Sequence, residues 1–362
     1  MPRTSVVAML VEKDRFEMRE VPVPPIGPDE GLLRVERAGV CGSDVLQMRG
    51  DTRTGFPAVP GHEPVGVIEE IGERAAKAWG VQRGDRVIVQ AGVPCLKCGP
   101  CRTGAFDTCK DRRVIGRTEL NVAPGLWGAF SQYLYLAPNT RMHKISKSVP
   151  LDVAATFNAL TCGIEWTGEA GIGLGDTVLL LGAGQRGLAS VIAARMRGAT
   201  TVIVTGLTRD RHKLDAALAL GASHVIDVEQ ENVVERVRDI TGGALADVVI
   251  DAVPYNTETF VDAVDCVRHG GTVFISGRKG PTSKVRNLVV DKIVENGLRI
   301  QGAHGKATES YRQVAAMLES GRFPLEKLAT HTFPLDQARL AIETLAGNVP
   351  GENAICVSLV PA

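Results

Sequence analysis

The sequence predicts an α/β protein in which a doubly wound parallel sheet is inserted into a β-rich domain. The chain has 362 residues, more than one hydrophobic core usually holds, so two domains are expected. In the first 150 residues, short β-branched segments are broken by Gly and Pro, which is typical of a β-rich, partly barrel-like domain. From about residue 155, apolar strands alternate with helices, which is the pattern of a parallel sheet covered by helices.

Three segments follow one another along the chain. The β-rich domain covers residues 1–154, and its strands are expected at 32–36, 65–71 and 85–90. The sheet-and-helix domain covers residues 155–297, with expected strands at 177–181, 201–205, 247–251 and 272–276. Residues 298–362, with an amphipathic helix near 310–318 and a terminal strand at 354–359, are expected to return to the first domain. The cleft between the two domains is then the expected ligand site.

Charge and hydropathy exclude several classes of partner. Lys plus Arg and Asp plus Glu each number 41, and this balance argues against nucleic acid or an anionic membrane surface as a partner. No apolar run reaches the roughly 18 residues of a membrane span, and the N-terminal segment meets a charge too early for a secretory signal. We therefore expect a cytoplasmic enzyme that acts on a small molecule.

Four of the eight cysteines lie within fifteen residues in the pattern C-x2-C-x2-C-x7-C: Cys95, Cys98, Cys101 and Cys109. In a reducing cytosol, this spacing favours metal ligands over disulfides. Four thiolates can close a tetrahedral shell around zinc and leave no open position for a substrate. We expect a structural zinc site, and the neutral charge disfavours the alternative of a zinc ribbon that binds nucleic acid.

A second, catalytic zinc site is expected from Cys41-Gly-Ser43-Asp44 and Gly61-His62-Glu63. Cys41 and His62 provide a thiolate and an imidazole, and a catalytic zinc keeps one position open for water or substrate. Glu63 can be a third ligand or lie just behind the ion. Asp44 is suited to accept the other ring N–H of His62, which would fix the imidazole tautomer.

The segment Gly182-Ala-Gly184-Gln-Arg-Gly187 follows an apolar strand and opens an Ala-rich helix, which is the context of a dinucleotide-binding loop. Gly182 would permit the tight turn, Gly184 the approach of the pyrophosphate, and Gly187 the close packing of the helix on the sheet. The N–H groups at the helix N-terminus would then face the phosphates. A dinucleotide cofactor is therefore expected.

The second strand of this domain ends at Gly206, where an acidic residue usually accepts hydrogen bonds from the adenosine ribose. Without that carboxylate, Thr208, Arg209 and Arg211 could supply donors for a 2′-phosphate. NADP is thus favoured slightly over NAD, although Asp210 could curl back and replace the missing carboxylate.

His304 and Lys306 could also reach the cofactor phosphates or ribose, and the alternative for both is a place in an exposed loop.

These motifs, together with Gly175-Asp-Thr-Val and Trp127-Gly-Ala-Phe-Ser-Gln-Tyr133, resemble the zinc-dependent medium-chain dehydrogenases over essentially the whole chain. The branch of sorbitol, threonine and bacterial alcohol dehydrogenases is the most similar. The resemblance implies a Rossmann domain inserted into a GroES-like catalytic domain, and a homodimer or homotetramer. It also implies reversible oxidation of an alcohol to a ketone or aldehyde with NAD or NADP. The two ligand sets predict two zinc ions per chain.

Two positions depart from the family's pattern. Asn158 stands where relatives usually carry a Cys or Glu zinc ligand, and a neutral amide binds zinc poorly. We therefore expect Cys41, His62 and Glu63 to hold the ion, with water in the fourth place and Asn158 bonded to that water or near the nicotinamide.

The second departure is Leu46, which replaces a histidine that ends a proton relay in many relatives. The proton is then expected to leave through Ser43, the cofactor ribose and solvent, or through another base, because zinc itself lowers the pKa of an alcohol.

Four apolar residues are candidates for the substrate-facing wall: Leu46, Phe56, Trp127 and Phe157. They would favour an apolar, even cyclic, secondary alcohol, but each could equally belong to the core. A polyol substrate, as in sorbitol-type relatives, is the alternative. A catalytically silent binding protein and a zinc-free reductase of activated double bonds stay open as other classes, although neither would require the Cys41, His62 and Glu63 set.

Overall fold

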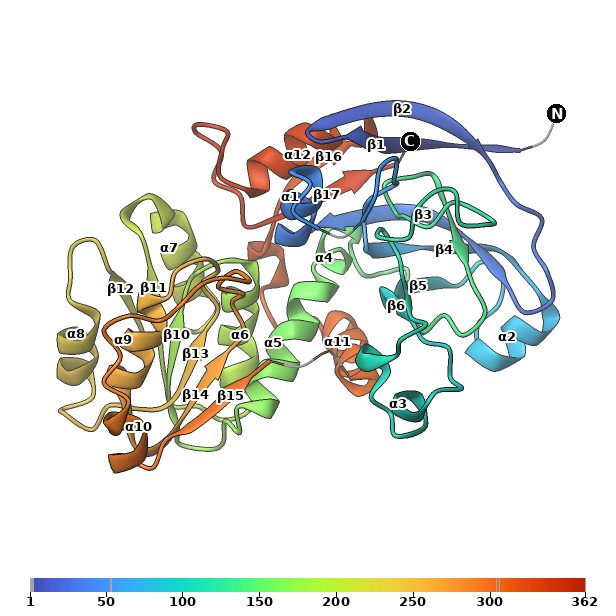
Figure 1. Ribbon diagram of the computed structural model, residues 1–362. Coiled ribbons are helices and arrows are strands. Elements are labelled where there is room, and N and C mark those ends of the chain that lie inside the picture. The colour runs from blue at the N-terminus through green and yellow to red at the C-terminus, as the bar shows by residue number, and fades with distance from the viewer. Residues whose placement is uncertain (1–2, 53, 304, 306, 362) are drawn as a thin grey trace. The chain divides into compact units, whose positions relative to one another are not determined.

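The computed structural model describes residues 3–52, 54–303, 305 and 307–361, and the chain forms two compact units (Figure 1). The first unit comprises residues 1–158, 314–321 and 329–362, and the second comprises residues 159–313 and 322–328. His304 and Lys306, considered above for the cofactor, lie outside the described residues. Among the described helices, none combines the length and the apolar character that crossing a bilayer requires.

The first unit is built on a seven-stranded sheet with the order β16-β17-β3-β4-β5-β9, and β8 pairs with β3. Its strands are β3 (Gly31–Val40), β4 (Glu63–Ile71), β5 (Arg86–Val89), β8 (Tyr133–Leu136), β9 (Met142–Lys144), β16 (Ala329–Pro334) and β17 (Cys356–Val360). A hairpin of β1 (Thr4–Glu12) and β2 (Arg15–Pro22) accompanies it, and β1 contributes Val7 and Leu10 to the core. The C-terminal segment thus supplies two strands to the sheet that the N-terminal part begins.

Short helices and a small ribbon complete this unit. The helices are α1 (Gly42–Met48), α2 (Glu73–Trp79), α3 (Gly99–Arg102), α4 (Leu151–Ala154) and α12 (Ala338–Leu345). The ribbon pairs β6 (Gly92–Val93) with β7 (Arg113–Val114), and it brackets the four-cysteine segment.

The second unit contains a six-stranded parallel sheet with the order β12-β11-β10-β13-β14-β15. The strands are β10 (Thr177–Leu181), β11 (Thr201–Gly206), β12 (His224–Asp227), β13 (Ala246–Asp251), β14 (Val267–Ile275) and β15 (Arg299–Gly302). Its helices are α6 (Gln185–Met196), α7 (Arg211–Ala219), α8 (Val233–Ile240), α9 (Glu258–Cys266), α10 (Asp291–Glu295) and nearly all of α5 (Phe157–Glu169). Helix α11 (Thr308–Ser320) begins in this unit, and its part from Val314 belongs to the first unit. The strand order reverses between β10 and β13, which is the switch point where such sheets bind ligands.

The predicted fold class is confirmed, and strand β10 covers the same residues as its prediction. Its Val and Leu residues are buried on both faces, as continuous apolar runs in parallel sheets are. The expected return to the first domain at residue 298 comes too early, however. Strand β15 pairs in parallel with β14, because the segment Arg299-Ile-Gln-Gly302 can use its backbone for pairing even though it has one apolar side chain.

Candidate active site

Three potential zinc ligands converge where strands β3 and β4 meet. Cys41 directly follows β3, and His62 and Glu63 lie at the start of β4, which runs antiparallel to β3 with Gly39 opposite Glu63. The ligand atoms of Cys41, His62 and Glu63 all lie within 4.8 Å of one another, and all three residues are buried. Antiparallel pairing therefore joins two motifs that are about twenty residues apart in the chain.

Gly61 determines how the chain enters this group. Its φ is +88°, in the left-handed region that glycine adopts without steric cost. A Cβ at this position would overlap the ring of Phe130 and come within 2.8 Å of the Phe130 backbone nitrogen. The Gly61 carbonyl also accepts a hydrogen bond from the Ala129 N–H at 2.9 Å. The backbone just before His62 is thus held by a contact that only glycine permits.

Asp44 orients two of the three ligands. Its Oδ1 lies 3.2 Å from His62 Nδ1, the contact expected from the sequence, and its Oδ2 accepts the Cys41 backbone N–H at 2.9 Å. Burial alone would lower the pKa of His62, but the Asp44 carboxylate and Cys41 outweigh it and raise that pKa to about 10. Because Nδ1 faces Asp44, the other ring nitrogen, Nε2, is left for a metal ion.

Ser43 and Glu63 lie on the Nε2 side of the imidazole. The Ser43 Oγ is 3.4 Å from His62 Nε2, and Glu63 Oε1 is 3.6 Å from the same atom. A hydroxyl and a carboxylate therefore border the atom that would face the ion.

The side chain of Asn158 is bonded to Glu63. Its Nδ2 donates a hydrogen bond to Glu63 Oε1, and both side chains are buried. The other carboxylate oxygen, Oε2, lies against Gly39, where a Cβ would come within 2.6 Å of it. Asn158 and Gly39 thus hold the Glu63 carboxylate from two sides, a contact that the sequence did not predict.

Cys356 is a further buried thiol close to this group. Strand β17 is antiparallel to β3, and Val357 lies opposite Val40. Cys356, the residue before Val357, therefore lies at the same end of the strand pair as Cys41. Burial, together with nearby Glu63 and Cys41, raises the pKa of the Cys356 thiol well above its ordinary value. Cys356 therefore borders the group as a further buried thiol.

The donor set of this site fits zinc. A thiolate, an imidazole and a carboxylate are all ligands that zinc takes, and a three-residue set is the kind that catalytic sites use. The contact between Asp44 and the far nitrogen of His62 is the outer contact that zinc-ligating histidines usually have.

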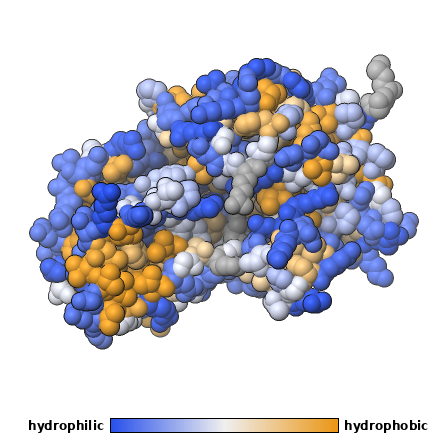
Figure 2. All heavy atoms as spheres, in the orientation of Figure 1, coloured by the Kyte–Doolittle hydropathy of each residue, from blue (hydrophilic) through white to orange (hydrophobic). Residues whose placement is uncertain are grey.

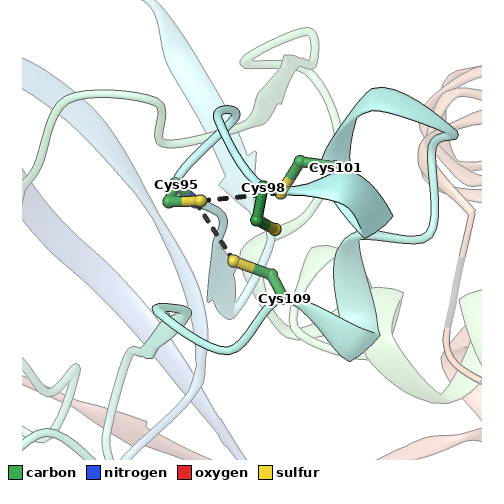
Figure 3. A group of neighbouring side chains, drawn as sticks. All are labelled: Cys95, Cys98, Cys101 and Cys109. Atoms are coloured by element: carbon green, nitrogen blue, oxygen red, sulfur yellow. Dashed lines mark hydrogen bonds between the residues drawn. The ribbon is translucent and has the colours of Figure 1, made fainter.

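The four-cysteine group forms a second set of ligands in the same unit (Figure 3). The Sγ atoms of Cys95, Cys98, Cys101 and Cys109 lie within 4.8 Å of one another. Backbone N–H groups of Lys97 and Cys98 lower the pKa of Cys95 to about 7, while burial and the neighbouring thiols raise that of Cys101 to about 12. Crowding four thiols in this way disfavours four negative charges unless a cation is present, so the group also fits zinc.

In the second unit, the glycine-rich loop connects β10 to α6. Gly182 has a φ of +102°, and a Cβ on Gly187 would overlap the Gly182 carbonyl oxygen. At Gly184, which caps α6, a Cβ would meet no described atom within 4 Å. The loop is therefore tight on the protein side and open where the first N–H groups of the helix begin, as a phosphate site requires.

Thr208, after the end of β11, was expected to supply donors for a 2′-phosphate, but its donors are already used within the protein. Thr208 Oγ donates to Asp227 Oδ2 at 2.8 Å, and the Thr208 backbone N–H donates to Glu229 Oε2 at 2.8 Å. Asp227 and Glu229 were not among the predicted site residues, because the strand that ends at Asp227, β12, was not among the predicted strands.

The charged residues on the other side of Thr208 are mostly paired. Arg211 Nε donates to Asp215 at 3.0 Å, and Lys213 Nζ lies 2.6 Å from Asp210. Arg209 is exposed and has no ion-pair partner within the described parts of the chain.

Of the four candidates for the substrate-facing wall, two belong to the core. Trp127 packs edge-on against Tyr135 with ring centroids 5.1 Å apart, and its indole N–H donates to the Val122 carbonyl. Phe157 is fully buried at the start of α5. Leu46 is half-buried on α1, and Phe56 is exposed.

Comparison with known proteins identifies the family of the chain. Residues 27–147 match the family model described as the alcohol dehydrogenase GroES-like domain, and residues 187–320 match the zinc-binding dehydrogenase model. The chain is 37% identical over 366 residues to a probable alcohol dehydrogenase of Mycobacterium tuberculosis, covering 98% of each. It is 30% identical over 357 residues to an erythritol/L-threitol dehydrogenase of Mycolicibacterium smegmatis, covering 96% of this chain and 95% of the relative.

Solved structures show the same architecture. A Sinorhizobium meliloti protein described as a zinc-binding dehydrogenase, bound to NADP, matches with a TM-score of 0.88 at 26% identity, covering 99% of this chain and all of that one. An Escherichia coli alcohol dehydrogenase complexed with NADH matches with a TM-score of 0.84 at 26% identity, with the same coverage. Structures similar to this chain thus hold either form of the cofactor.

Proposed function

Because the chain belongs to the zinc-dependent medium-chain alcohol dehydrogenase family and is an NAD(P)-dependent alcohol or polyol oxidoreductase, we propose that it oxidises a secondary alcohol reversibly to a ketone. The observation that carries the proposal is the buried group of Cys41, His62 and Glu63 with Ser43 beside it. A structural or binding protein would have no need for this group.

We assign one zinc ion to each ligand set, two per chain. Cys41, His62 and Glu63 would hold the catalytic ion, which when bound supplies a Lewis acid that lowers the pKa of an alcohol. The four cysteines would hold the structural ion. A bound nicotinamide ring would supply the acceptor for the hydride.

The side chains around the ligands have separate tasks. Asp44 keeps His62 Nδ1 protonated and thereby directs Nε2 away from itself, and Asn158 holds the carboxylate of Glu63. Ser43 takes the proton that the alcohol releases, because its hydroxyl lies 3.4 Å from His62 Nε2 and can both donate and accept. Leu46 offers no base, so the proton would leave Ser43 toward solvent or the hydroxyls of a bound cofactor.

An assay with alcohols and ketones, run in parallel with NAD and NADP, tests the reaction. We expect Cys41→Ala to lose one zinc ion and nearly all activity. Cys162→Ala is the matched control, since Cys162 is a buried cysteine in neither ligand set. Full activity of Cys41→Ala would refute the mechanism.

We further propose an apolar or cyclic substrate, which the half-buried Leu46 near Ser43 on α1 supports. A polyol is the second candidate, because relatives of this chain include erythritol/L-threitol and sorbitol dehydrogenases. The same assay separates them: kcat/KM for cyclohexanol or a 2-alkanol should exceed that for erythritol or sorbitol. The reverse order would select the polyol.

We propose a homodimer or homotetramer that assembles through strand β15. This strand is at the edge of its sheet, and beside it α10 and the preceding residues expose Val289, Val290 and Val294 at 54%, 61% and 77%. Figure 2 shows the apolar surface in this region as a broad orange area. A second copy would offer the same edge and the same valines, so the surface is suited to pair with itself.

Light scattering tests the assembly. We expect the mass of a dimer or tetramer for the wild type and a smaller particle for Val290→Lys with Val294→Lys. Leu174→Lys is the control, since Leu174 is 90% exposed elsewhere in the same unit. A monomeric wild type would contradict the proposal.

A further inference from the structure

The ends of β11 and β12 lie side by side at the glycine-rich loop. In the parallel register, Gly206 at the end of β11 is opposite Asp227 at the end of β12. A Cβ at Gly206 would be 3.6 Å from the Cβ of Ala183, which lies inside the glycine-rich loop. The strand ends therefore border the loop, at the position where dinucleotide domains bind the adenosine ribose.

Gly206 has little room for an acidic side chain of its own. A Cβ there would come within 2.9 Å of Leu214 Cδ2 on α7. A carboxylate at this edge therefore comes more readily from the neighbouring strand, and Asp227 and the nearby Glu229 supply two.

These carboxylates occupy the donors that a 2′-phosphate would need. The Thr208 hydroxyl donates to Asp227 and its N–H donates to Glu229, while the Glu229 N–H donates to Asp227 Oδ1 at 3.1 Å. An ionised carboxylate offers about four acceptor positions, so both retain capacity for a ribose hydroxyl.

The cations at this edge are too few to reverse the charge. Arg211 is paired with Asp215 and Lys213 with Asp210, which leaves Arg209 as the one cation of this loop, residues 207–213, without an ion-pair partner among its described residues. Among the described residues, this edge thus has one arginine without an ion pair and the two carboxylates of Asp227 and Glu229, and a 2′-phosphate would add up to two more negative charges.

We infer that Asp227 and Glu229 take the place of the carboxylate missing at position 206 and select NAD over NADP. The inference rests on the proposed function, since it concerns the ribose of the same nicotinamide cofactor. It departs from the preference for NADP that Gly206, Thr208, Arg209 and Arg211 suggest when they are considered along the chain alone.

Binding of cofactor fragments tests the inference without any turnover. Calorimetry on the zinc-loaded chain compares 5′-ADP, which has a free 2′-hydroxyl, with 2′,5′-ADP, which carries the phosphate. We expect 5′-ADP to bind at least about tenfold more tightly to the wild type. The kcat/KM values for NAD and NADP should differ in the same direction.

Neutral variants identify the residues. The double variant Asp227→Asn with Glu229→Gln should bind 2′,5′-ADP about tenfold more tightly than the wild type does. Its affinity for 5′-ADP should fall by a smaller factor. Glu229→Gln alone, at an exposed position, should shift the ratio in the same direction and guards against misfolding of the double variant. Glu231→Gln is the control, because Glu231 is an exposed carboxylate of the segment between β12 and α8, as Glu229 is, but it pairs with Arg236. It should leave the ratio unchanged.

Tighter binding of 2′,5′-ADP to the wild type, lost in Arg209→Ala, would overturn the inference while leaving the proposed enzyme intact. An equal shift in the Glu231→Gln control would also overturn it, since only net charge would then matter. Absence of binding by both fragments and both dinucleotides would overturn the nicotinamide site and the inference together.

Discussion

Replacing Gly61 with Ala should disrupt the proposed catalytic zinc site, although Gly61 is only the neighbour of the ligand His62. A non-glycine residue in the left-handed region costs about 1 to 2 kcal/mol. The added methyl group would also overlap Phe130, including its backbone nitrogen at 2.8 Å, and overpacking of this kind costs about 1 to 3 kcal/mol. We expect a loss of about 2 to 5 kcal/mol in the free energy of unfolding.

Gly84→Ala separates strain from overlap. Gly84 lies in the same unit with a φ of +90°, and a Cβ there would meet no described atom within 4 Å. Gly84→Ala should therefore show the backbone strain alone. In urea denaturation, Gly61→Ala should be about 1 to 3 kcal/mol less stable than Gly84→Ala.

Metal analysis completes the test. Gly61→Ala should retain the zinc of the four cysteines and lose the other ion, because His62 is displaced, whereas Gly84→Ala should keep both. Equal stability of the two variants, with both ions retained in Gly61→Ala, would refute the argument from the Phe130 contact.

Three further predictions concern the neighbours of the metal ligands. Asn158→Ala should lower kcat/KM about ten- to hundredfold with the structural zinc retained, since a hydrogen bond to a charged group contributes about 1.5 to 3 kcal/mol. Unchanged steady-state kinetics would show that Glu63 does not need the hydrogen bond from Asn158. Burial lowers the pKa of His62 but Asp44 raises it to about 10, so in zinc-free protein the stabilisation is complete below pH 6.5 and lost as the pH rises toward 10. After zinc is removed with a chelator, the melting temperature of Asp44→Asn should depend less on pH over this range than that of the wild type. The same pH dependence in both proteins would contradict the prediction. Cys101→Ser should lose one zinc ion and thermal stability while kcat of the folded fraction stays nearly unchanged, and a large fall in kcat would assign this zinc a direct role.

The hydrophobic pattern predicted four of the six strands of the parallel sheet, but not β12 or β15. Residues 177–181 could be identified because a strand buried on both faces is a continuous apolar run bounded by Gly. Strand β15 has no such run, since Ile300 is its one apolar residue. Its place depends on backbone pairing with β14, which is a tertiary contact that a local pattern does not carry.

The two ligand sets could be predicted because their residues are close in sequence or flank adjacent strands. The contact between Asp44 and His62 followed from the same local motifs, and the structure contains it. The partner of Asn158 could not be predicted in this way. It lies 95 positions from Glu63, and the start of α5 had to be placed against the start of β4 before the hydrogen bond became visible.

At Asn158 and at Gly206 an expected charged residue is missing, and at both positions a neighbouring carboxylate decides the effect. Asn158 lacks the charge of a ligand, yet it holds the charged Glu63. Gly206 lacks a carboxylate, yet Asp227 brings one to the same strand end from the adjacent strand. A bound metal or ribose responds to the charges around it and not to the position in the chain that supplies them. Loss of an acidic residue at a motif position therefore predicts a change of specificity only when no strand beside it restores the charge.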